Sequence, residues 1–123
     1  MKLLVALATL SLASCATIPS AEAGPTAGIG QIAYTNGIRV RPLQVVEDSR
    51  CPSNVQCVWA GRLIVRSDII GGSWHRVMDL ELGKGQPVAD GTLTLVSAVP
   101  AKVAGAEPDP RSYRFTFRFD GGL

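Results

Sequence analysis

The fold of this chain is decided by the stretch from Tyr113 to Phe119, which reads Tyr-Arg-Phe-Thr-Phe-Arg-Phe. Successive side chains of a β-strand point to opposite faces, so this period of two places all four aromatic rings on one face. The four rings belong to a chain whose aromatic residues are 2 Trp, 2 Tyr and 3 Phe. Aromatic side chains bury large apolar areas, and we therefore expect this strand to anchor a β core.

Shorter segments elsewhere alternate in the same way, and no window keeps a helical period. Two-residue turn sequences separate some of these segments: Asn36-Gly37 predicts a hairpin, and Gly71-Gly72 predicts a tight connection. Strands at intervals of about 8 to 12 residues predict an all-β fold, either a small antiparallel β-sandwich or a partly open barrel of six to seven strands. The expected strands run over 32–34, 38–45, 62–68, 74–82, 92–99 and 113–119.

The apolar alternation changes phase once in the strand over 38–45. Ile38 and Val40 are apolar at even positions, whereas Leu43 and Val45 are apolar at odd ones. An extra residue produces such a change, so we predict a β-bulge at Arg41-Pro42. In the strand over 92–99 we expect the apolar side chains at odd positions to lie on one face throughout. These are Leu93, Leu95 and Val99.

The N-terminal residues have the pattern of an export signal. Lys2 precedes an apolar run over 3–12 that is interrupted only by Thr9 and Ser11. The run is too short to span a membrane, which takes about 20 apolar residues. One alternative is an ordinary secretory signal, cleaved after a small residue as in Ala21-Glu22-Ala23.

The run ends in Leu12-Ala13-Ser14-Cys15, which resembles the lipobox of bacterial lipoproteins. The resemblance implies that residues 1–14 are a signal peptide and that Cys15 is the lipid attachment site, acylated on its sulfur and its amine. The bilayer is then a partner through the acylated Cys15, because two or more acyl chains make release slow. In that family an Asp after the cysteine favours the inner membrane, so Ala16 implies a protein anchored in the outer membrane and facing the periplasm.

The segment after this cysteine consists mostly of small residues and is interrupted by Pro19, Gly24 and Pro25. This composition predicts that residues 15–27 are the lipidated cysteine and a flexible tether. Residues 28–123 suffice for one modest hydrophobic core, so we expect a single all-β domain there.

The charge balance and the motif inventory exclude several classes of function. The net charge is only +2, so we expect no nucleic-acid partner, which would require clustered Lys and Arg. The chain has no Gly-rich phosphate loop, haem-attachment box or Cys-x-x-Cys, so we expect no cofactor. Apart from Cys15, the soft metal ligands are Cys51, Cys57 and His75, fewer than the four of a structural zinc site, so we expect no metal.

Two cysteines, Cys51 and Cys57, remain once Cys15 carries lipid. An exported protein meets an oxidising compartment, so a disulfide between them is the default prediction. In the chain-entropy model, closing so short a loop contributes roughly 2 kcal/mol. We expect the bridge to staple a loop between two strands, and we expect Gly61 to lie where no side chain fits.

The segment around these cysteines reads Glu-Asp-Ser-Arg-Cys-Pro from Glu47 and Cys-Val-Trp-Ala-Gly from Cys57. This box resembles a group of small bacterial envelope lipoproteins and secreted proteins of unassigned function. The resemblance extends from Gly30 to the strand over 113–119. It implies an all-β fold, a cystine loop and an envelope location, and it carries no activity.

The same box supplies a candidate binding surface made of Asp48, Arg50, Trp59 and Arg62. Arg and Trp are over-represented among binding hot spots, and here they stand beside a rigid loop. The structural alternative is that Asp48 and Arg50 satisfy each other and the loop backbone, while Trp59 packs over the disulfide.

Two pairs of residues invite a catalytic interpretation. Ser73 and His75 lie two apart on one expected strand face, and so do Asp79 and Glu81. The serine does not lie in a nucleophile-elbow motif of the kind found in α/β-hydrolases. A solvated pair of carboxylates is common on a strand whose other face is apolar, so Asp79 and Glu81 need no catalytic role. We therefore expect no catalytic residues.

Outward-facing arginines form a basic patch if their strands are neighbours, and such a patch would suit lipid phosphates or an acidic partner. The alternative, which we favour, is that exposed strand faces carry charge to resist edge pairing. The arginines concerned are Arg39, Arg41, Arg62, Arg66, Arg114 and Arg118.

Together these features predict a membrane-anchored envelope lipoprotein with a non-catalytic binding or structural role. Besides the bilayer, the expected partner is an envelope protein or a glycan. An alternative is an inhibitor of a host or competitor enzyme such as a muramidase, since envelope-anchored lysozyme inhibitors are also small disulfide-stapled β domains. A hydrolase is a weaker alternative.

Overall fold

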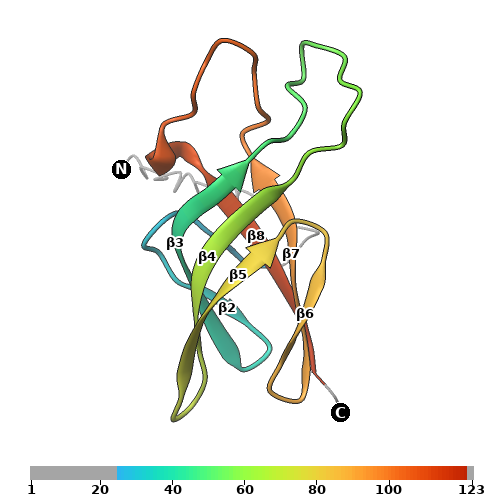
Figure 1. Ribbon diagram of the computed structural model, residues 1–123. Helices are drawn as coiled ribbons and strands as arrows, with labels where there is room; N and C mark the ends of the chain where they lie inside the picture. Colours follow the sequence, from blue (N-terminus) through green and yellow to red (C-terminus); the bar gives the residue numbers. More distant parts are fainter. Residues whose placement is uncertain (1–24, 122–123) are drawn as a thin grey trace, which may run out of the picture.

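The computed structural model describes residues 25–121, which form two antiparallel sheets of four strands each. Figure 1 shows the strands running along one long axis, with connections gathered at both ends. The only helix of the described residues is the short 3-10 turn η1 (Pro110–Ser112). The strands are β1 (Thr26–Ala27), β2 (Ala33–Thr35), β3 (Ile38–Asp48), β4 (Leu63–Ile70), β5 (His75–Glu81), β6 (Gly85–Val88), β7 (Gly91–Val99) and β8 (Arg114–Asp120).

One sheet has the order β2-β3-β4-β5 and the other the order β1-β8-β7-β6. The sheets pack against each other as an open sandwich, so the predicted all-β fold is confirmed. The two strands beyond the six expected segments are β1 and β6, which have 2 and 4 residues. Neither has room for an alternating pattern, which explains why the sequence did not reveal them.

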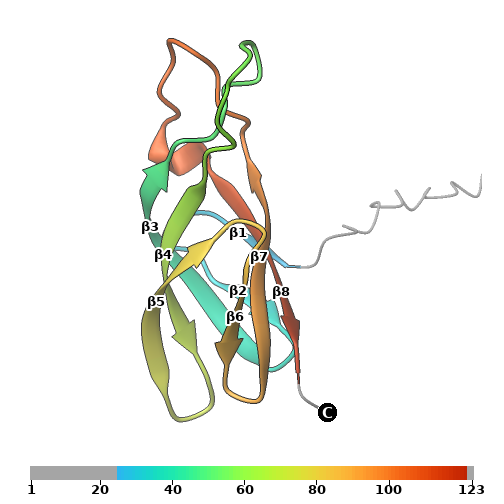
Figure 2. The same cartoon turned by 45° about the vertical axis from the view of Figure 1, so that its right-hand side comes forward.

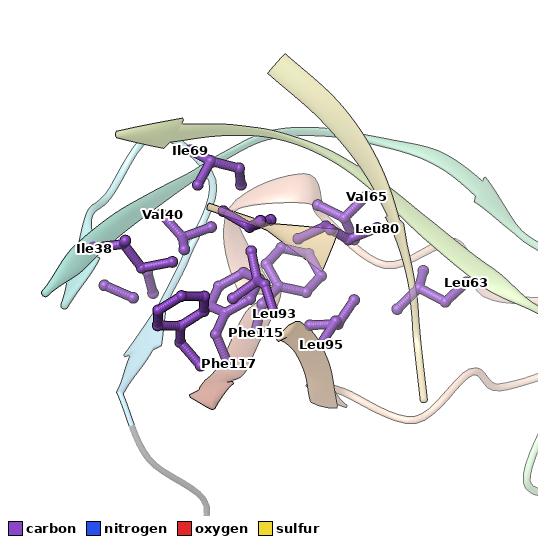
Figure 3. Close-up of a cluster of buried hydrophobic side chains, with 14 of the residues drawn as sticks. Ile38, Val40, Leu63, Val65, Ile69, Leu80, Leu93, Leu95, Phe115 and Phe117 are labelled. Atoms are coloured by element: carbon purple, nitrogen blue, oxygen red, sulfur yellow. The ribbon is translucent and has the colours of Figure 1, made fainter. Parts of the chain in front are cut away.

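The core lies between the sheets and is built around the aromatic face of the last strand (Figure 3). Phe115 and Phe117 have no exposed surface, and Tyr113 and Phe119 are at most 5% exposed. The prediction that all four rings share one buried face is confirmed. Burying such side chains is worth roughly 1.5–3 kcal/mol each. The aliphatic partners from both sheets are Ile38, Val40, Leu63, Val65, Ile69, Leu80, Leu93 and Leu95.

Strand β3 contains the phase change expected from its apolar pattern. Its register against β4 shifts between Pro42 and Gln44, which makes Leu43 the extra residue, one position after the predicted site. A second shift lies between Val45 and Glu47. Leu43 and Val46 are consequently exposed by 38% and 42%.

In strand β7 the side chains at odd positions stop facing the core after Leu95, contrary to the prediction. Its register against β8 shifts between Leu95 and Ser97, so the faces exchange beyond that point. Val99 is therefore 51% exposed, and Ala98 packs against the core in its place. The prediction for Val99 was wrong because a single inserted residue reverses every later side chain.

The sheet begins two residues before the predicted domain start. Thr26 and Ala27 pair with Thr116 and Phe115 of β8, and Ala27 is buried, so these two residues are not tether. The predicted signal peptide and the lipid site Cys15 lie outside the described residues. The described part of the chain contains no helix able to cross a bilayer.

Candidate functional site

Two long loops meet at one end of the sandwich. One connects β3 to β4 over residues 49–62, and the other connects β7 to β8 over residues 100–113. Figures 1 and 2 show both loops projecting beyond the sheets, side by side in the two views. Hydrogen bonds join them: Ser53 N donates to Lys102 O at 2.7 Å, and Ala104 N donates to Asn54 Oδ1 at 2.9 Å. We call these two segments the loop pair.

The first loop is closed by the predicted disulfide. Cys51 and Cys57 are bonded, with their Cα atoms 5.8 Å apart. At the base of the loop, Ser49 N donates to Arg62 O at 2.8 Å, and the Trp59 indole N–H donates to Ser49 O at 3.3 Å. The loop is therefore closed three times along its length, and few of its conformations remain accessible.

A carboxylate at the end of β3 holds the base of the loop pair. Asp48 accepts hydrogen bonds from Arg50 Nε at 2.8 Å and from Arg50 Nη2 at 3.0 Å. Its Oδ2 also accepts from the Tyr113 hydroxyl at 2.8 Å. The two charged side chains are only 11% and 16% exposed. Because Asp48 belongs to one sheet and Tyr113 directly precedes β8 of the other, the carboxylate links the sheets at this end.

Arg50 also fastens the second loop. Its guanidinium donates to the carbonyl oxygens of Ala98 at 3.4 Å and Pro100 at 3.1 Å. From the other direction, Lys102 Nζ donates to the backbone carbonyl of Asp48 at 2.7 Å. A charged group donates a stronger hydrogen bond than a neutral one, so the bonds from Arg50 help to order both loops.

The protonation behaviour of this cluster follows from burial and hydrogen bonding. Burial raises the pKa of Asp48, but the hydrogen bonds from Arg50 and Tyr113 outweigh it, so the pKa lies below its ordinary value. The hydrogen bond to Asp48 raises the pKa of Arg50. Burial and then the hydrogen bond to Asp48 raise the pKa of Tyr113 to about 12. Around neutral pH the cluster is an ion pair with a neutral phenol.

The four residues of the candidate binding surface thus divide into two kinds. Asp48 and Arg50 are turned toward each other and the backbone, as the structural alternative predicts. Trp59 is 58% exposed, and the Arg62 side chain is 54% exposed and paired with Glu47. The accessible part of the surface is therefore Trp59 and Arg62.

Sequence reasoning missed three further exposed apolar side chains of the loop pair. Val58 is fully exposed, and Val55 and Val103 are 45% and 44% exposed. The residues from Cys51 to Gly61 carry no charge, and this uncharged run was the signal that could have revealed them. We use the name apolar tip for the four exposed apolar side chains of the loop pair, which are Val55, Val58, Trp59 and Val103.

No protein-family model matches this chain. Comparisons with curated proteins and with solved structures likewise give no match. The resemblance of the cysteine box to envelope lipoproteins therefore stays a prediction, and the function is argued from the geometry of the loop pair.

The two residue pairs considered for catalysis, Asp79 with Glu81 and Ser73 with His75, lie in different surroundings. Asp79 is paired with Arg66 at 3.0 Å and Glu81 with Lys84 at 3.3 Å, so each carboxylate has its own cation. Ser73 lies in the β4–β5 turn, and His75 Nδ1 is 3.2 Å from Asp68 Oδ1. Within residues 25–121 no hydrogen bond joins the Ser73 hydroxyl to the His75 ring, and no group of three His, Cys, Asp or Glu side chains is placed to hold a metal.

The outward arginines do not all share one surface. Arg39, Arg41 and Arg66 lie in the sheet of β3 and β4, whereas Arg114 and Arg118 lie in β8 of the other sheet. Arg66 and Arg118 are paired with carboxylates, and so is Arg62. This distribution agrees with the preference for solvated strand faces over a basic patch.

Proposed function

We propose that this protein is a lipid-anchored envelope protein that acts without catalysis, by binding a protein partner through its apolar tip. The anchor rests on the lipobox resemblance at Cys15, and the binding role rests on the loop pair. The single observation that carries the binding role is the exposure of Val58 and Trp59 on the uncharged segment from Cys51 to Gly61, whose loop is closed by the disulfide.

The physical argument concerns the cost of binding. Ordering a flexible loop on association costs free energy, and a loop that is already ordered avoids this cost. The disulfide and the Asp48–Arg50 pair order the loop pair before any partner arrives. Exposed aliphatic and Trp side chains then contribute affinity by leaving water, and Trp is enriched among residues that dominate interfaces. A partner with a small apolar recess fits this surface.

Val58→Asp tests the binding role. We expect the variant to lose most of the partner captured from native envelope membranes by the tagged full-length protein, because the partner would bury a carboxylate at this position without a counter-ion. Since Val58 is fully exposed, the free energy of unfolding should barely change. The matched control is Val77→Asp, which places the same charge on a half-exposed residue of β5. Equal capture by both variants would contradict the proposal.

The projection of the loop pair beyond the sheets favours one second function, the inhibition of an enzyme by insertion into its cleft. A muramidase is the first enzyme to titrate with the purified protein. Nanomolar inhibition that Val58→Asp abolishes and Val77→Asp retains would support an inhibitor in place of an envelope partner.

Cys15→Ser tests the anchor separately. The sulfur is the atom that the lipobox resemblance marks for acylation, so the variant should incorporate no labelled fatty acid. We expect it to accumulate as uncleaved precursor or as protein released from the membrane fraction. Fatty-acid labelling equal to that of the wild-type protein would refute the anchor while leaving the binding proposal intact.

A further inference from the structure

A hollow of about 350 Å³ lies on the outer face of the sheet β2-β3-β4-β5, beside the turn between β4 and β5. Figure 1 places this turn at the end of the sandwich opposite the loop pair. The volume is at the lower end of the range for small-molecule sites. The side chains that give the hollow its chemistry are Arg39, Asp68, Ile70, Trp74 and His75.

The cross-strand register explains why these side chains meet. Arg39 of β3 is opposite Ile70 of β4, and Ile70 is opposite His75 of β5. On the other side of Arg39 stands Tyr34 of β2, which is 68% exposed. Residues directly opposite each other in a sheet project to the same face, so an aromatic ring, a cation, an aliphatic chain and an imidazole form one row.

The indole of Trp74 forms the wall of the hollow because Gly71 leaves space for it. A methyl group at Gly71 would overlap the indole atoms Cε2 and Nε1, whereas a methyl group at Gly72 would meet nothing within 4 Å. The turn is closed by a hydrogen bond from Gly71 N to Trp74 O at 2.8 Å. The ring can therefore lie there only because residue 71 has no side chain.

Several polar groups of the hollow have no partner within the described residues. Arg39 makes no ion pair or side-chain hydrogen bond there, and the Trp74 N–H donates to no acceptor. Asp68 Oδ1 lies 3.2 Å from His75 Nδ1, while Asp68 Oδ2 makes no hydrogen bond within the described residues. The hollow thus offers a cation, a neutral donor and an acceptor around an aromatic wall.

We propose that this hollow binds an acidic saccharide, meaning a sugar ring that carries a carboxylate. The C–H face of a sugar ring packs against an aromatic ring, here Trp74, while its hydroxyl groups both donate and accept hydrogen bonds. The unpaired guanidinium of Arg39 matches a carboxylate, which it can bind with two parallel hydrogen bonds. Asp68 then accepts from a ring hydroxyl. This site is separate from the apolar tip and does not depend on the proposed function.

The test titrates the protein with trigalacturonate, in which each ring carries a carboxylate, and with its fully methyl-esterified form, which is neutral. The readout is the Trp74 indole N–H resonance in a Trp59→Phe background. We expect trigalacturonate to shift this resonance in a saturable way and the ester to bind about tenfold more weakly, the loss typical of a hydrogen bond to a charged group.

Variants of the hollow complete the test. Arg39→Gln should weaken trigalacturonate binding about tenfold for the same reason. Gly71→Ala should also weaken it, because the methyl group displaces the indole, whereas Gly72→Ala should not. Val58→Asp should leave this binding unchanged, which separates it from the proposed function.

Three results would overturn the proposal. The first is an unshifted Trp74 resonance at millimolar trigalacturonate. The second is equal affinity for the acid and the ester. The third is saturation by acetate alone with the same dependence on Arg39, which would indicate a simple carboxylate site rather than a saccharide site.

Discussion

Replacing Asp48 with alanine is expected to lower the free energy of unfolding by about 3 kcal/mol, the lower end of the cost of breaking a buried ion pair, because this pair is partly buried. The substitution leaves the Arg50 guanidinium, whose side chain is 16% exposed, without its counter-ion, and it leaves the Tyr113 hydroxyl without its acceptor. Urea unfolding of the purified protein measures the effect.

The matched control is Asp79→Ala. Asp79 also pairs with an arginine, but the two side chains are 45% and 44% exposed. Exposed pairs contribute about 0–1 kcal/mol, so this variant should unfold close to the wild-type midpoint. If the two variants lose equal stability, the Asp48 cluster does not hold the loop pair.

The same cluster predicts how stability depends on pH. The pKa of Asp48 is lowered in the folded protein, so its contribution is complete above the ordinary value of 3.8 and is lost as the pH falls through the folded value. The pKa of Tyr113 is raised to about 12, so its contribution is complete below the ordinary value of 10.0 and is lost as the pH rises toward 12. Tyr113→Phe should remove the alkaline loss and keep the acid one.

Gly61→Ala is expected to destabilise the protein by about 3 kcal/mol or more, from two costs that act together. Gly61 has a φ of +68°, where an L side chain costs about 1–2 kcal/mol. A methyl group there would also overlap the carbonyl group of Ser49, and overpacking against backbone typically costs a further 1–3 kcal/mol. Urea unfolding again gives the value.

Gly105→Ala separates these two costs. Gly105 has a φ of +81°, but a methyl group there would meet nothing within 4 Å. Only the backbone cost applies, so we expect a loss of about 1–2 kcal/mol. A Gly61 variant that is no less stable than the Gly105 variant would show that the approach of Ser49 does not constrain the loop.

The sequence was sufficient to predict the main strands because their inner and outer faces differ in polarity. The strand over 113–119 was found from its aromatic alternation, and the hairpin at Asn36-Gly37 from its turn residues. The extra residues in β3 and β7 were harder to place, because a bulge depends on the partner strand as well as on the bulged one. Val99 was misplaced for this reason.

The candidate site was only half predictable. The disulfide and the closeness of Asp48 to Arg50 follow from short sequence separations. Tyr113 is 65 residues from Asp48, and the two meet because β8 lies in the sheet facing β3. The exposure of Val58 was equally hidden, since an uncharged loop can be buried or exposed until its neighbours are known.

The link between the sheets at Asp48 and Tyr113 has a consequence for protein engineering. Both loops leave the sandwich beside this link, so the framework that positions them is separate from the side chains they display. Residues 53–56 and 103–106 could then be exchanged for other sequences while the disulfide, Asp48, Arg50, Gly61 and Tyr113 are kept. In these terms the sandwich is a scaffold for loop grafting, in the manner of the binding loops carried by immunoglobulin sandwiches.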